Sequence, residues 1–316
     1  MLLQLLKRAG ILLGSLVVSS IIVFGFMAVL PGDPARVALG VNASEEAVEQ
    51  MRTSFGLDRP LFVQYLDWVR GLVTFDPGIS YVSRAPIGPQ IADRLQVSLW
   101  LVATSMIIAL VLAVPAGVVM AVKHRRLSGL LLSAASQVGV AIPAFLAGIL
   151  LITVFAVGLG WLPANGWTPP AEDPVAFLKQ LILPTLALGI VQAAVLTRYV
   201  RSAVLDVLRE DYLRTARAKG LTAGQALRRH GLRNAAVPVV TVLALQLSTL
   251  LIGAVVVERV FVIPGLGSLL LDSVANRDLI MIQDVVMILV VAVLLVNFLV
   301  DLLYLVIDPR LRSARA

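Results

Sequence analysis

Nearly uncharged stretches recur along the 316-residue chain, and each is about long enough to cross a bilayer. A helix needs about 20 apolar residues for that. We predict six such helices, near residues 9–30, 98–122, 130–159, 181–199, 236–257 and 285–307. The stretches lack the alternation of apolar and polar residues that the strands of membrane barrels show. The pattern therefore predicts an all-α polytopic membrane protein.

Basic residues are distributed unevenly between the two sets of connections. The N-terminus, the loop at 123–126, the segment 198–233 and the C-terminus hold most of the 26 Lys and Arg residues. Because basic loops stay in the cytoplasm, both termini are predicted to be cytoplasmic. The same bias explains the net charge of +7 better than nucleic-acid binding does. The first apolar run is too long for a signal peptide core, so we expect an uncleaved span.

The connections divide the chain into four predicted parts. These are a cytoplasmic N-terminus with the first helix (1–30), an extracytoplasmic region (31–97), a core (98–307) and a cytoplasmic tail (308–316). Apolar residues at helical spacing in the extracytoplasmic region predict an amphipathic helix of the kind that rests on a membrane surface. They are Phe62, Tyr65, Leu66, Val69 and Leu72.

A long basic loop, residues 201–235, interrupts the core between the fourth and fifth helices. Helical spacing of apolar residues over 205–216 predicts one helix, which Gly220 ends. Thr222 and Gln225 fit a capping box, so a second short helix is expected to end near Gly231. Such a loop either lies on anionic lipid or offers a corner of small residues to another protein.

The segment "EDYLRTARAKG" (210–220) resembles the cytoplasmic "EAA" loop of ABC importer permeases, in the version of the dipeptide/oligopeptide family. That version typically reads "YxRTARAKG…RHxLRNA…P", and this sequence fits it through Pro238. The general motif has Glu-Ala-Ala where Arg214-Thr215-Ala216 stand. "LPGDPA" (30–35), "PGLG" (264–267) and "VDLLYLVIDPRLR" (300–312) extend the resemblance over nearly the whole chain.

The resemblance implies a type I ABC importer permease fold in the cytoplasmic membrane of a prokaryote. In that family the loop forms a coupling helix that docks on an ATPase subunit. The implied coupling residues are Tyr212, Leu213, Arg214, Thr215, Ala216, Arg217, Ala218, Lys219, Gly220 and Leu221. The implied partners are a second homologous permease, one or two kinds of ATPase subunit and an extracytoplasmic substrate-binding protein. The expected cargo is a di- or oligopeptide, with glutathione, a nickel chelate or haem as alternatives.

Two further sets of residues are candidates for contact with cargo. Amides and a hydroxyl within spans either join helices or line a solvated path, and these are Gln137, Gln192, Gln246, Thr249 and Asn297. The Gly- and Pro-rich segment 258–278 is too short to cross twice, so we expect a re-entrant or capping hairpin at the outer mouth. Its candidate residues are Pro264, Gly265, Gly267, Asp272, Asn276, Arg277 and Asp278.

Other protein classes lack their usual sequence features. The chain has no Cys and no phosphate-binding Gly-x-x-x-x-Gly-Lys-[Ser/Thr] loop. We therefore expect no enzyme activity, cofactor or metal on this chain by itself, and ATP and Mg are expected on the partner ATPase subunits. A stand-alone secondary transporter, the main alternative class, would be expected to show internal repeats and charged residues in mid-span.

Overall fold

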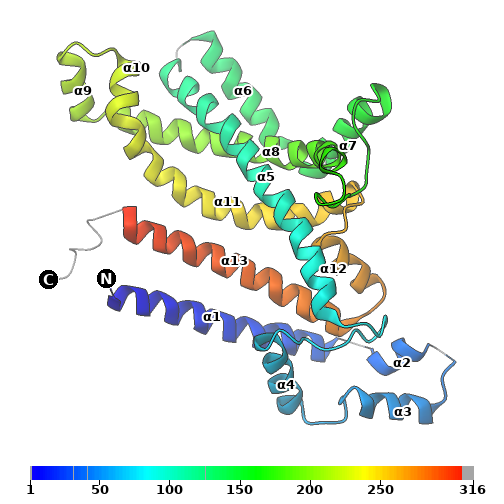
Figure 1. Cartoon of the computed structure of the whole chain (residues 1–316). Coiled ribbons are helices and arrows are strands. Elements are labelled where there is room, and N and C mark those ends of the chain that lie inside the picture. The colour runs from blue at the N-terminus through cyan, green and yellow to red at the C-terminus, as the bar shows by residue number, and fades with distance from the viewer. Residues whose placement is uncertain (1, 31, 41, 125, 308–316) are drawn as a thin grey trace. The chain divides into compact units, whose positions relative to one another are not determined.

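The computed structural model describes residues 2–30, 32–40, 42–124 and 126–307 (Figure 1). Within these ranges the regular structure is helical, apart from one isolated bridge between Ile79 and Pro86. The chain forms two compact units. Unit 1 comprises Met1–Ser98 and Pro264–Phe298, and unit 2 comprises Leu99–Ile263 and Leu299–Ala316.

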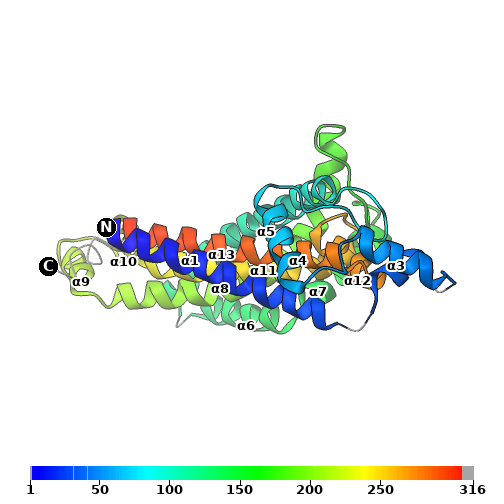
Figure 2. The ribbon, with the colours of Figure 1, turned by 90° about the horizontal axis from the view of Figure 1, so that it is seen from below.

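Unit 1 combines two long helices with several short ones. Its helices are α1 (Leu2–Val29), α2 (Pro34–Leu39), α3 (Glu45–Ser54), α4 (Leu61–Val73), the start of α5 (Ile87–Val122), α12 (Leu266–Ala275) and most of α13 (Leu279–Ile307). The helix α1 runs beside the unit 1 part of α13 (Figures 1 and 2). The short helix α4 packs against both, because Trp68 is buried with Val23 of α1 and Met287 of α13.

Unit 2 is built around α8. Its other elements are the rest of α5, α6 (Leu127–Ala141), α7 (Ala144–Leu151), a π-helix η1 (Ile152–Gly158), α8 (Pro174–Leu208), α9 (Asp211–Ala218), α10 (Ala223–Ala226), a second π-helix η2 (Leu227–Gly231) and α11 (Leu232–Val260). The helices α6, α7 and α11 all contact α8. Glycine permits close approach between α8 and α5: a Cβ on Gly189 would lie 2.9 Å from Ile108 of α5.

Among the described residues, five helices are long and apolar enough to cross a membrane, or six if the bent pair α6 and α7–η1 counts as one span. The helix predicted over 130–159 is not continuous. The chain bends by 101° after Ala141, because Pro143 disfavours the helical region for Ile142, whose ψ is 122°. Each of the other five predicted ranges overlaps one long helix, namely α1, α5, α8, α11 or α13, and each of these helices begins before its predicted range.

The basic loop differs from its prediction in two places. The single helix expected over 205–216 is interrupted, because α8 ends at Leu208 and Glu210 is extended (φ −67°, ψ 141°) before α9 begins. The second helix does not end near Gly231; it continues through η2 into α11. The loop therefore passes directly from η2 into α11, with no irregular backbone between these two helices.

Candidate functional site: the α9 loop and an aromatic pocket

The inner face of α9 is fixed by small and apolar contacts. Leu213 and Ala216 are buried, and Gly231 of η2 lies against Leu213. A Cβ on Gly231 would be 3.3 Å from the Leu213 side chain and 3.1 Å from Val207 of α8. Gly231 thus lets α8, α9 and η2 meet closely.

The turn after α9 is set by two local signals. Gly220 has φ +95°, a backbone conformation that side chains with a Cβ rarely adopt. Thr222 and Gln225 then form the predicted capping box: the Thr222 N–H donates to Gln225 Oε1 at 3.0 Å, and the Gln225 N–H donates to Thr222 Oγ1 at 3.3 Å. Both features hold α9 in a fixed orientation relative to α10.

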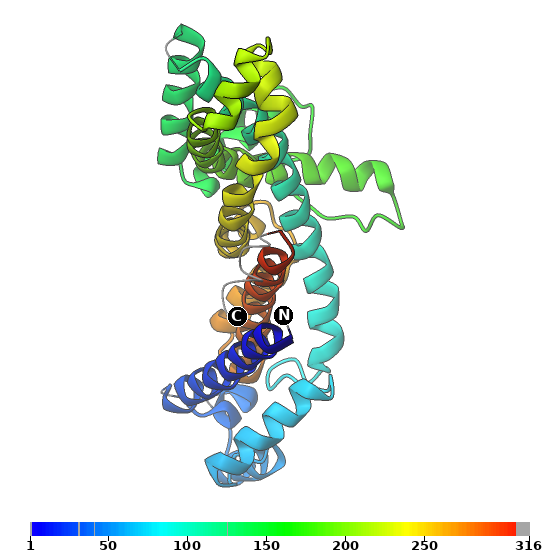
Figure 3. The same cartoon turned by 90° about the vertical axis from the view of Figure 1, so that its left-hand side faces the viewer.

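The outer face of α9 carries the charges. The exposed residues are Tyr212, Arg214, Thr215, Arg217, Ala218, Lys219 and Gly220, whereas Leu221 is half-buried. Within the described ranges Arg214 pairs only with Asp211 on the same helix, at 3.4 Å, and Arg217 and Lys219 form no ion pair with any described residue. Figures 1 and 3 show α9 beside α10 at one end of unit 2.

One expectation for this corner is corrected by burial. Ala216 was predicted to leave room for another protein, but its side chain is buried within the loop. Gly220, by contrast, has no described atom within 4 Å of the point that a Cβ would occupy. The exposed Ala218 and Gly220 are therefore the small residues that a partner could approach.

Three of the five polar residues proposed for the path contact one another. Gln192 Nε2 donates to the backbone oxygen of Gln246 at 3.3 Å, and Thr249 Oγ1 donates to Gln246 Oε1 at 3.1 Å. The buried Gln246 Nε2 has no partner among the residues that the structure describes. Gln137 lies elsewhere in unit 2, in a pocket between α6 and α8, and Asn297 is exposed on α13 in unit 1.

The segment expected to form a hairpin at the outer mouth contains a helix, α12, preceded by Pro264 and Gly265. Gly265 and Gly267 are buried, whereas Asp272, Asn276 and Arg277 are exposed. Asp278 is buried and accepts hydrogen bonds from the Ser80 hydroxyl and, at 3.3 Å, from the Tyr81 N–H. Asp278 therefore fastens the loop before α5 to the start of α13.

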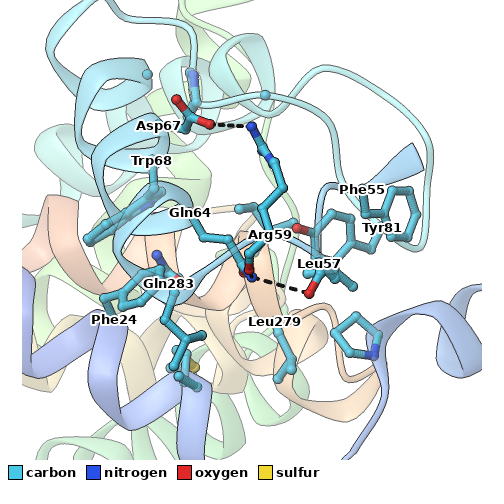
Figure 4. A pocket seen from close by; sticks show the side chains of 18 of the residues that line it. Phe24, Phe55, Leu57, Arg59, Gln64, Asp67, Trp68, Tyr81, Leu279 and Gln283 are labelled. Atoms are coloured by element: carbon cyan, nitrogen blue, oxygen red, sulfur yellow. Dashed lines mark hydrogen bonds and ion pairs between the residues drawn. The ribbon is translucent and has the colours of Figure 1, made fainter. Parts of the chain in front are cut away.

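Unit 1 also contains a pocket of about 490 Å³ that the sequence did not reveal (Figure 4). Two ion pairs stand in its wall: Arg52 with Asp33 at 2.7 Å and Arg59 with Asp67 at 2.6 Å. Hydrogen bonds to Asp33 and then to Glu49 raise the pKa of Arg52. The pairs join residues up to 19 positions apart, so no local motif could have predicted them.

Aromatic side chains and one buried amide complete this pocket. Trp68 lies near Phe24 and Gln283 (Figure 4), and its Nε1 donates to Asp284 Oδ1 at 2.7 Å. Gln283 Nε2 is buried without a partner in the described part of the chain. Tyr81 stacks on Phe55 with ring centroids 4.2 Å apart, and burial, with the nearby Asp284 and Asp278, raises its pKa to about 12.

Known proteins match the whole length of the chain. Residues 113–313 match the family described as "Binding-protein-dependent transport system inner membrane component", and residues 1–103 match its N-terminal companion family. The chain belongs to this permease family. The permease is 43% identical over 315 residues to "Glutathione transport system permease protein GsiC" of Escherichia coli (strain K12), covering 99% of each chain. The protein of the same name from Shigella flexneri serotype 5b is 42% identical with the same coverage.

A solved structure supports the fold of the permease. The match is titled "Crystal structure of an amino acid ABC transporter with histidines"; its TM-score is 0.54 at 18% identity, covering 68% of this permease and 92% of that chain. The predicted all-α permease fold is therefore confirmed, and so is the ABC peptide/glutathione-type family. The permease is a multi-pass membrane subunit of an ABC importer rather than a stand-alone secondary transporter.

Proposed function

We propose that this permease forms half of the translocation path of an ATP-driven importer for small peptides, with glutathione as the leading cargo. The observation that carries this proposal is the 43% identity to glutathione permeases over practically the entire chain. The match covers 99% of the chain, so it includes both the α9 loop and the predicted extracytoplasmic region, residues 31–97. A di- or oligopeptide is the broader class to which such a cargo belongs.

In this proposal the outer face of α9 receives the ATPase subunit. The residues 201–235 are cytoplasmic, as are both termini, and ATP and Mg bind to the ATPase rather than to this chain. Arg217 and Lys219 have no ion pair within the described ranges, so they are available to bind acidic groups of a partner. Closure of two ATPase subunits moves α9, and the contact at Gly231 passes that movement to α8 and α11.

The cargo side of the proposal places a second, homologous permease opposite this one, with a substrate-binding protein at the outer mouth near α12. Gln192, Gln246 and Thr249 are the polar residues of α8 and α11 that already contact one another. The Gln246 Nε2, unpartnered among described residues, is a donor that a peptide carbonyl or carboxylate would satisfy. Alternating access then follows if the two bundles have inward and outward states of similar free energy.

Reconstituted uptake tests the proposal directly. The permease is assembled in liposomes with its partner permease, ATPases and binding protein, and labelled glutathione uptake is measured with ATP inside. We expect ATP-dependent uptake that unlabelled di- and tripeptides reduce by competition. Gln246→Leu should slow uptake, whereas Leu245→Ala, at an exposed neighbouring position, should leave it nearly unchanged. Uptake without ATPase subunits, or none of any peptide, would refute the proposed function.

A further inference from the structure

A second polar pocket lies in unit 2, among α5, α6 and α8. Its volume is about 480 Å³, within the range of small-ligand pockets. It is lined by Met120, Ser133, Gln137, Val195, Arg198, Tyr199, Arg201 and Ser202. Of these residues, only Gln137 is a candidate for contact with cargo from the sequence.

Close helix contacts border this pocket. The Ser136 hydroxyl of α6 donates to the backbone oxygen of Ala194 at 2.7 Å, and a Cβ on Gly139 would lie 2.7 Å from Ala194. On α5, a Cβ on Gly117 would lie 2.6 Å from Val200 of α8. Both α5 and α6 are thus held against α8 beside the pocket, so its walls are helices in direct contact rather than mobile loops.

The pocket is basic, and its charges are not neutralised by the described part of the protein. No Asp or Glu is among its lining residues, and neither Arg198 nor Arg201 forms an ion pair with another residue of the described ranges. Hydroxyl groups of serine and tyrosine and the Gln137 amide add further donors. Two guanidinium groups with additional donors suit an oxyanion that has several acceptor oxygens, as a phosphate does.

The depth of the pocket indicates where that anion comes from. On α8, residues 180–197 carry no charge, and at 1.5 Å per residue they span about 27 Å, close to the hydrocarbon thickness of a bilayer. Arg198 and Arg201 are the first charged residues beyond this stretch. They are therefore expected at the level of the lipid phosphates, on the side of the membrane where α9 lies.

We propose that this pocket binds the phosphate group of an anionic phospholipid, held by Arg198 and Arg201. The remaining polar residues of the pocket donate to the other phosphate oxygens, and the acyl chains extend along the apolar surface of the bundle. The site is separate from the outer face of α9, and the inference does not depend on which cargo the permease carries.

Lipid retention by the full-length chain tests this proposal. The purified chain is placed in nanodiscs of phosphatidylcholine with a minority of phosphatidylglycerol, released into the gas phase, and the co-isolated lipids are counted by native mass spectrometry. We expect selective retention of phosphatidylglycerol. Arg198→Gln/Arg201→Gln should reduce it by roughly tenfold or more, as expected for the loss of two charge-assisted contacts.

A matched control distinguishes binding in this pocket from the general attraction of basic residues to anionic lipid. Arg228→Gln/Arg229→Gln removes the same number of charges from exposed positions in the same loop region, and it should leave retention unchanged. If the first double variant fails to fold, Arg201→Lys keeps the charge but loses the planar fork, and it should give an intermediate reduction.

Three results would overturn the proposal. Retention of phosphatidylglycerol could be equal in all variants, or it could fall equally in both double variants. In a third arm, phosphatidylcholine nanodiscs are supplied with inorganic phosphate alone. Binding of that phosphate at Arg198 and Arg201, without retention of phosphatidylglycerol in the first arm, would identify a soluble anion rather than a lipid as the ligand.

Discussion

The residues around the unit 1 pocket, here called the pocket region, and the α9 loop of unit 2 use charged residues in opposite ways. In the pocket region Arg52 and Arg59 are each paired with an aspartate from another segment. In the α9 loop, the arginine and lysine side chains of the outer face have a single partner among the described residues, Asp211, bound weakly at 3.4 Å. One region neutralises its charges, and the other leaves them exposed.

We expect this difference to reflect a structural role for the pocket region and a docking role for the α9 loop. The buried Trp68 packs against α1 and α13 and donates to Asp284, so the partners of its side chain lie within unit 1. The α9 loop has only a narrow buried face, Leu213 and Ala216, and exposed surface ion pairs contribute little to stability. We expect the exposed charges of α9 to bind acidic groups of a partner protein, and the family implies ATPase and binding-protein partners.

The largest expected effect is on the unfolding free energy, through a substitution in the pocket region. Trp68→Ala removes a buried aromatic side chain and leaves Asp284 Oδ1 without its donor. We expect a loss of about 3–5 kcal/mol in unfolding free energy, measured by thermal or denaturant unfolding in detergent. Phe62→Ala on the exposed face of the same helix should change it by less than about 0.5 kcal/mol. Equal effects would show that α4 is not packed as described.

The next effect concerns the backbone of α9. Ala216→Pro removes a helical hydrogen bond at a cost of about 3 kcal/mol, so transport should be abolished while membrane insertion persists. Asp211→Pro is the matched control, because Asp211 is the first residue of α9 and Glu210 is already extended. This variant should transport nearly as well as the unmodified permease. Normal uptake by Ala216→Pro would contradict a role for α9 in coupling.

A smaller effect is expected at the turn. Gly220→Ala forces a Cβ onto a residue with φ +95°, at a cost of about 1–2 kcal/mol. Gly224→Ala, inside α10 and equally free of neighbours, should instead stabilise the loop by up to about 1 kcal/mol. Hydrogen exchange of the loop amides would measure both changes in the stability of the loop. Faster exchange in Gly224→Ala than in Gly220→Ala would refute the role given to the backbone conformation of Gly220.

The smallest effect appears only in alkaline solution. Burial raises the pKa of Tyr81 to about 12, above its usual value of 10.0. Its contribution to stability is therefore complete below pH 10 and is lost as pH rises from about 10 to 12. Ultraviolet absorbance of tyrosinate, compared between the permease and Tyr81→Phe, should assign a late titration to this residue. A titration near pH 10 would mean that the pocket wall is open to solvent.

Features that depend on neighbouring residues could be predicted from the sequence. The spans follow from runs of apolar residues, and the capping box follows from Thr222 and Gln225 alone. The break at Pro143 had a local signal, but the apolar run continues through it and concealed the bend. The extended residue Glu210 has no such signal, because neither Gly nor Pro is adjacent to it.

Features that depend on distant residues could not be predicted in this way. Trp68 and its partner Asp284 are 216 positions apart, and no periodic pattern connects them. Ala216 likewise is buried on a helix whose contacts, with α10 and η2, form only when the loop folds back. The family resemblance implied which residues couple to the ATPase, and the structure divides these residues into a buried face and an exposed one.

Site-specific photo-crosslinking tests the central claim most directly, which is that the exposed face of α9 binds the ATPase subunit. A photoreactive residue is placed at Ala218 on that face, and at Glu46, an exposed position on α3, in the assembled importer. We predict a crosslink to the ATPase subunit from position 218 and none from position 46. The absence of an ATPase crosslink from position 218, or equal crosslinks from both positions, would contradict the account.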